Sequence, residues 1–172
     1  HLLGEAVDQP RAELGDLAAH MGLDVVGEQG AAPFGVVEPH AARAADLVAR
    51  HGVREATVDD AASAEVVVLA VKPNTVPKVL DALHGPLAPG ALVISIAAGV
   101  PLTVLEGALP GVAVVRVMPN TPAQVGQGMS VAVGNGVVTE AHRRIVTSLL
   151  NAVGKSAWIN DEALIDVVTA LS

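Results

Sequence analysis

The stretch VVVLAVKPNTVPKVL, residues 66–80, joins a strand to a helix. It begins with an unbroken apolar run, which is typical of a strand covered on both faces of a sheet. Lys72 and Pro73 end this run, and helical spacing follows them. In open α/β sheets, ligands bind outside the carboxyl ends of the strands. The lysine therefore has two interpretations: the strand simply leaves the core there, or the strand ends at a ligand.

Strand-like and helix-like segments alternate from residue 35 onward, which is the signature of βαβ units. We therefore predict an α/β fold, a Rossmann-like parallel sheet with flanking helices, over residues 35–160. Strands are expected at residues 35–38, 65–71, 92–97, 112–119, 130–134 and 156–160, and helices at residues 39–51, 75–87, 101–109 and 139–154, with a further helix from residue 161.

The composition narrows the classes of function. Hydrophobic residues make up 51% of the 172 residues, yet there is one Phe, one Trp and no Tyr, so the core must be aliphatic. A net charge of -8 and the scarcity of aromatic side chains argue against a nucleic-acid partner. The sequence has no cysteine, which excludes disulfide and thiolate chemistry and fits a cytoplasmic protein. The apolar runs are too short to cross a bilayer, so we expect no membrane segment and no signal peptide.

Residues 1–34 do not continue the alternation. A complete dinucleotide-binding domain has a first strand followed by a G-x-G-x-x-G turn that receives the pyrophosphate. The nearest candidate is GEQGAAPFG, residues 27–35, and its glycine spacing is wrong. We therefore expect the first strand and the glycine-rich turn to be missing. Our hypothesis is that residues 1–34 are out of frame, foreign or disordered.

Three motifs lie at the ends of successive predicted strands: AVKP at residues 70–73, SIAAGV at 95–100 and RVMPNTP at 116–122. In a parallel sheet they meet at one edge, which would bring Lys72, Gly99 and Asn120 together. Each alone is explained without a ligand, as a solvated lysine, a turn glycine and a turn asparagine. Together they form a rim of small residues with one cation and one amide, where a flat ligand can approach the backbone.

The segments VVVLAVKP, ISIAAGV, VVRVMPNTPAQVGQGM and DVVTALS, in this order and at these spacings, resemble pyrroline-5-carboxylate reductase. The resemblance covers about residues 36–172. It implies an oxidoreductase of proline biosynthesis, a pathway of amino-acid biosynthesis. The resemblance implies that the C=N bond of the small molecule 1-pyrroline-5-carboxylate is reduced with NADPH, with NADH as the alternative, to form L-proline. The full-length protein would be a homo-oligomer.

The resemblance also implies roles for individual residues. Two strand ends of the family border the cofactor, and the MPNTP segment lies near the nicotinamide. The cofactor-binding residues so marked are Ala70, Val71, Lys72, Pro73, Ala97, Ala98, Gly99 and Asn120. Of these, Asn120 is the catalytic candidate, because it lies near the reaction centre.

The family continues past the position of Ser172 into an all-helical domain, which dimerises and binds the substrate's carboxylate. Residues 161–172 would then be the start of a truncated helical domain. Because both ends of the family's cofactor domain are affected, we expect a fragment that is inactive by itself.

Other chemistry has less support. The six histidines lack metal-ligand spacing, so we predict no metal site. The carboxylates of Glu38 and Glu162 are most simply strand-end, capping or solvated groups. Glu38, at the end of the second predicted strand, has a second interpretation as the acid that binds the ribose of NAD. An arginine nearby would instead favour NADP, but Arg43 lies a turn and a half into a helix, a distance that counts against it, so the choice of cofactor stays open. The alternatives are another Rossmann oxidoreductase, such as a coenzyme F420-dependent NADP reductase, and a non-catalytic remnant.

Overall fold

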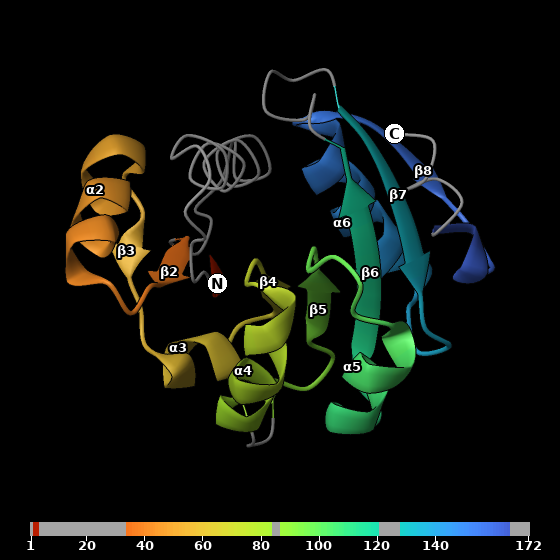
Figure 1. Ribbon diagram of the computed structural model, residues 1–172, viewed down its shortest axis with the longest axis horizontal. Helices are drawn as coiled ribbons and strands as arrows, with labels where there is room; N and C mark the ends of the chain where they lie inside the picture. Colours follow the sequence, from red (N-terminus) through yellow and green to blue (C-terminus); the bar gives the residue numbers. More distant parts are fainter. Residues whose placement is uncertain (1, 4–33, 84–86, 121–127, 166–172) are drawn as a thin grey trace.

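The computed structural model describes residues 2–3, 34–83, 87–120 and 128–165. One sheet organises the described residues, with strand order β3-β2-β1-β4-β5-β6-β7-β8 (Figure 1). The strands are β1 (Leu2–Leu3), β2 (Gly35–Val37), β3 (Arg54–Glu55), β4 (Val66–Leu69), β5 (Leu92–Ser95), β6 (Ala113–Pro119), β7 (Gly128–Gly134) and β8 (Gly154–Trp158). The helices are α2 (Ala41–His51), α3 (Val58–Ala62), the 3-10 helix η1 (Pro73–Thr75), α4 (Val76–Ala82), α5 (Leu102–Ala108) and α6 (Glu140–Asn151).

The predicted parallel sheet is confirmed for β4, β5 and β6, which are adjacent and in register. One pair differs from the prediction, because β7 runs antiparallel to β6. No crossover helix was expected between these two strands, and without one the chain returns beside the strand it has just left. The strand predicted at residues 156–160 is present as the edge strand β8, which begins at Gly154.

The expectation that the first strand is missing is wrong. Leu2–Leu3 forms β1, which pairs in parallel with β2 on one side and β4 on the other. The position between two parallel strands offers backbone donors and acceptors on both sides, and an extended pair of residues satisfies them without any glycine pattern. The expected absence of a glycine-rich turn, and the out-of-frame hypothesis, concern residues 4–33, which lie outside the described residues.

Both faces of the sheet are covered by apolar side chains, as the unbroken Val and Leu runs predict. Successive strand residues point to opposite faces, so Val67 and Val68 belong to different core clusters. One cluster includes residues of α6, and the other includes residues of α3, α4 and α5, which lie together in Figure 1. Full burial of a side chain such as Val93 or Val114 contributes about 1.5–3 kcal/mol. Among the described residues, no helix is long and apolar enough to cross a membrane.

A capping box begins α3. The Thr57 hydroxyl accepts the Asp60 N–H at 3.2 Å, and the Asp60 carboxylate accepts the Thr57 N–H and the Thr57 hydroxyl, both at 2.8 Å. These bonds, the backbone N–H first, lower the pKa of Asp60 below 3.8, and the nearby Arg54 adds a smaller effect. Because the folded-state pKa is depressed, the stabilisation is present above pH 3.8 and is lost as the pH falls through the folded-state value.

We predict that Thr57→Ala raises the pKa of Asp60 toward 3.8 without reaching it, since the hydroxyl is lost but the backbone N–H remains. An NMR titration of the Asp60 carboxyl carbon measures the value. Ser63→Ala is the control, because the Ser63 hydroxyl donates to the Asp59 carbonyl and not to Asp60. A Thr57→Ala value equal to the parent's would show that the hydroxyl bond has no effect.

Candidate functional site

The register of three strands brings the predicted site residues to one edge. Leu69, Ser95 and Arg116 lie side by side in β4, β5 and β6. Lys72, Gly99 and Asn120 follow them by three, four and four residues along parallel strands.

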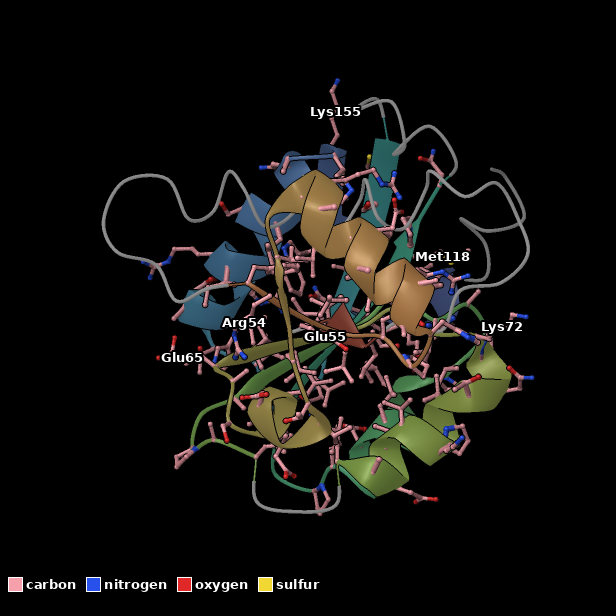
Figure 2. The ribbon with its side chains drawn as sticks, turned by 90° about the vertical axis from the view of Figure 1, so that its left-hand side faces the viewer. Arg54, Glu55, Glu65, Lys72, Met118 and Lys155 are labelled. Atoms are coloured by element: carbon pink, nitrogen blue, oxygen red, sulfur yellow. The ribbon has the colours of Figure 1, made fainter. Side chains whose placement is uncertain are left out.

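The prediction that these three residues share the carboxyl edge is therefore confirmed. Figure 2 shows Lys72 and Met118, which belong to this edge, on one side of the molecule. Arg54 and Glu65, at the amino ends of their strands, lie on the opposite side.

The end of β4 exposes only part of the AVKP motif. Ala70 and Val71 are 4% and 7% exposed and belong to the two core clusters, so their side chains pack into the protein. Lys72 then caps η1, where its carbonyl accepts the Thr75 N–H at 2.9 Å, and Pro73 is exposed as the first residue of that helix. Thus Lys72 and Pro73 are the side chains of this motif that a ligand at the edge can contact.

The end of β5 presents bare backbone. Ala97 is buried, and its N–H donates to the Ser95 hydroxyl at 3.4 Å, whereas Ala98 and Gly99 are exposed. Gly99 has φ of 72°, and a Cβ built on it would meet no atom of the described residues within 4 Å. The space that a side chain would occupy is therefore open, which allows a flat ligand to reach the main chain.

The end of β6 is held by the side chain of Asn120. Its Oδ1 accepts the N–H of Met129, in the neighbouring strand β7, at 2.8 Å. This bond orients the carboxamide so that Nδ2 is the donating group left at the edge, and the described part of the chain gives Nδ2 no acceptor. Asn120 thus has a structural role as well as a group that a ligand can use.

A charged pair lies at the end of β2. The Glu38 side chain is 2% exposed; its Oε1 accepts the His40 N–H at 2.9 Å, and its Oε2 lies 3.5 Å from Nη1 of Arg43. The expectation that Arg43 is too far away is wrong. The helix was predicted from residue 39 but begins at Ala41, so Arg43 lies in its first turn and reaches back to Glu38.

Sequence reasoning missed the contact between Arg116 and Glu162, which are 2.7 Å apart. Glu162 was interpreted as a strand-end, capping or solvated residue, and its pairing with Arg116 was not expected. Arg116 inside an apolar strand was a signal that a carboxylate lies nearby. No group of three or more histidines and carboxylates in the described ranges is placed to hold a metal ion. The absence of a metal site stays a prediction.

The sequence of the chain matches a known protein family over a part that includes two strand ends of this edge. A family model described as NADP oxidoreductase, coenzyme F420-dependent, matches residues 14–99, which is half of the chain. The chain belongs to this family. The matched range includes β4, the AVKP motif and the turn after β5, so two of the three strand ends described above are part of the family's common region.

Pyrroline-5-carboxylate reductases are among the relatives. The enzyme from Pseudomonas aeruginosa is 46% identical over 121 residues, which are 70% of this chain and 44% of that protein. The chain thus spans less than half the length of this relative.

Solved structures of such reductases share the fold. The structure from Coxiella burnetii has a TM-score of 0.80 at 28% identity, and the match covers 99% of this chain and 62% of that one. The Plasmodium falciparum reductase, solved with NADP bound, has a TM-score of 0.78 at 24% identity over 99% of this chain and 61% of that one, and at this identity it supports the fold alone.

We predict that Asn120→Ala lowers the free energy of unfolding by about 1 kcal/mol, because Met129 loses its hydrogen-bond acceptor. Asn120→Asp keeps an acceptor oxygen and should cost less. Denaturant unfolding of the two variants and the parent measures the difference. Equal losses in both variants would contradict the role assigned to Oδ1.

Proposed function

We propose that this chain is the cofactor-binding part of a pyrroline-5-carboxylate reductase, which reduces 1-pyrroline-5-carboxylate to L-proline in the final step of proline biosynthesis. The observation that carries the proposal is the edge itself: Lys72, Gly99 and Asn120 end three adjacent parallel strands, within motifs that resemble those of the reductase. The similarity to the Pseudomonas aeruginosa reductase supports it. On the family resemblance, we extend the proposal to a cytoplasmic, homo-oligomeric complete protein.

The edge fits a nicotinamide dinucleotide. When bound, this cofactor supplies a hydride to the imine carbon, while the C=N electron pair moves to nitrogen, which gains a proton. We assign three tasks to the chain's own residues. The open backbone at Ala98 and Gly99 receives the flat part of the ligand, Lys72 brings a positive charge, and Nδ2 of Asn120 donates a hydrogen bond near the reaction centre.

The pair at the end of β2 favours NADPH over NADH in this proposal. Both oxygens of the Glu38 carboxylate face a donor already, Oε1 the His40 N–H and Oε2 the Arg43 guanidinium, and the side chain is almost fully buried. It is therefore poorly placed to accept hydrogen bonds from a ribose. The Arg43 side chain is 37% exposed and carries a positive charge, which suits the phosphate that distinguishes NADP.

A coenzyme F420-dependent NADP reductase is the second candidate, because the family model carries that description. The match to the family model ends at residue 99, whereas the similarity to the Coxiella burnetii reductase structure extends over 99% of this chain. The VVRVMPNTP and DVVTALS segments, which resemble the proline enzyme, lie beyond residue 99. We therefore favour the reductase of proline biosynthesis.

The protein that contains this chain should oxidise NADPH when pyrroline-5-carboxylate is added and should not reduce coenzyme F420. Asn120→Asp should lower kcat/KM about tenfold or more, since it removes a donor worth about 1.4 kcal/mol while keeping the bond to Met129. Absorbance of NADPH follows the reaction, and Lys78→Ala, an exposed change on α4, is the control. Turnover with coenzyme F420 instead would favour the second candidate.

Arg43→Ala should weaken NADPH binding at least tenfold and leave NADH binding nearly unchanged, because the lost charge faces the extra phosphate. Calorimetry with both dinucleotides measures the two affinities. Arg50→Ala is the matched control, since this arginine lies in the last turn of the same helix. Equal weakening of both dinucleotides would assign Arg43 to the fold and not to cofactor choice.

A further inference from the structure

Arg116 is a charged residue in the core. It lies on β6 between Ser95 of β5 and Val133 of β7 and is 6% exposed. Its side chain points to the same face as Val114, toward the cluster that contains α4 and α5. A buried guanidinium needs a carboxylate nearby, and Glu162 supplies one, with Oε1 at 2.7 Å from Nη1.

The same oxygen of Glu162 makes a second bond. Leu102, the first residue of α5, donates its N–H to Oε1 at 2.8 Å. The first N–H groups of a helix have no partner within the helix, and the preceding residue, Pro101, provides no side-chain cap. Glu162 therefore caps α5 from a position 60 residues further along the chain.

These two bonds bracket one turn of the candidate site. Arg116 lies beside Ser95, and the Ser95 hydroxyl receives the N–H of Ala97, where the turn begins. Leu102 lies three residues after Gly99, where the turn has entered α5. The exposed backbone at Ala98 and Gly99 thus lies between β5, which pairs with the strand that carries Arg116, and the start of α5, and both Arg116 and the Leu102 N–H bond to Glu162.

Glu162 is also connected to the segment that follows it. Its carbonyl accepts the Ile165 N–H at 2.9 Å, and Ile165 is fully buried in the same core cluster as Leu102 and Leu105. The Asp161 carboxylate accepts the Ala163 N–H at 3.0 Å and begins the helical turn, as the sequence predicts. A shift of this turn relative to the edge must break the contact with Arg116.

We propose that Glu162 is a positioning residue for the carboxyl edge. It does not touch the ligand; it acts through Arg116 and the Leu102 amide, and it holds the turn at residues 97–101 and the helical turn at residues 163–165 in one arrangement. The consequence for hydride transfer rests on the proposed function, whereas the coupling of the two turns does not.

The test separates positioning from stability by replacing both charged partners, Arg116→Met with Glu162→Met. The Arg116 side chain is 7% exposed and that of Glu162 is 26% exposed. Replacing both partners with apolar residues leaves no unpaired charge in the core and is often neutral, so the double variant should fold with a stability near the parent's. Amide hydrogen exchange then measures how readily the structure opens at each amide. We expect exchange at Ala97, whose buried N–H donates to the Ser95 hydroxyl, and at Leu102 to accelerate at least tenfold, while exchange at Val93 and Val114 stays within twofold of the parent's.

Glu162→Gln provides a second variant, which keeps an acceptor for Leu102 and removes the charge; Glu140→Ala, in the first turn of α6, is the control. In Glu162→Gln we expect a smaller acceleration at the same two amides and none in the control. Unchanged exchange at Leu102 in the double variant would overturn the proposal, and so would an equal acceleration at all four sites. A chain that binds no NADP would contradict the proposed function alone, because exchange is measured without cofactor.

Discussion

In-register parallel pairing of β4, β5 and β6 is the constraint on which the rest of the structure depends. The pairing matches Val67 with Val93 and Val93 with Val114, so their side chains enter the same core cluster. A slip of one residue would send each of these side chains to the other face of the sheet. Since both faces are apolar, hydrophobicity alone would tolerate the slip. Arg116 would not tolerate the slip, because its guanidinium can bond to Glu162 only on the face of the sheet where it now lies.

The same register builds the candidate site, because parallel strands end at one edge. The chain leaves each of the three strands in a different way. Lys72 caps η1, Gly99 forms a turn with a positive φ, and the Asn120 side chain accepts a hydrogen bond from the next strand. Two carboxylates, Glu38 and Glu162, lie near this edge, and each is matched with an arginine. Within the described residues, the edge therefore offers a ligand hydrogen-bond donors and positive charge, and these two carboxylates are not free, which suits a phosphate-bearing dinucleotide.

The fold class and the rim were predictable, because buried parallel strands leave a clear apolar run and a turn after each run. Contacts across the sheet were not predictable, since no local pattern marks them: the pairing of Arg116 with Glu162 joins residues 46 positions apart. The contact between Arg43 and Glu38 was missed because the helix begins two residues later than predicted, at Ala41 and not at residue 39. Strand β1 was missed for another reason, because two leucines outside any longer apolar run carry no strand signal of their own.

The account's central claim is that the carboxyl edge of β4, β5 and β6 is where the dinucleotide binds. NMR titration of the isotope-labelled chain with NADP, carried to millimolar concentration so that weak binding is also seen, tests this most directly. The account predicts that the amide shifts of Lys72, Gly99 and Asn120 move together along one saturation curve. It also predicts that Gly90 and Gly111, which precede the amino ends of β5 and β6, do not move. Shifts confined to Gly90 and Gly111, or no shifts at all, would contradict it.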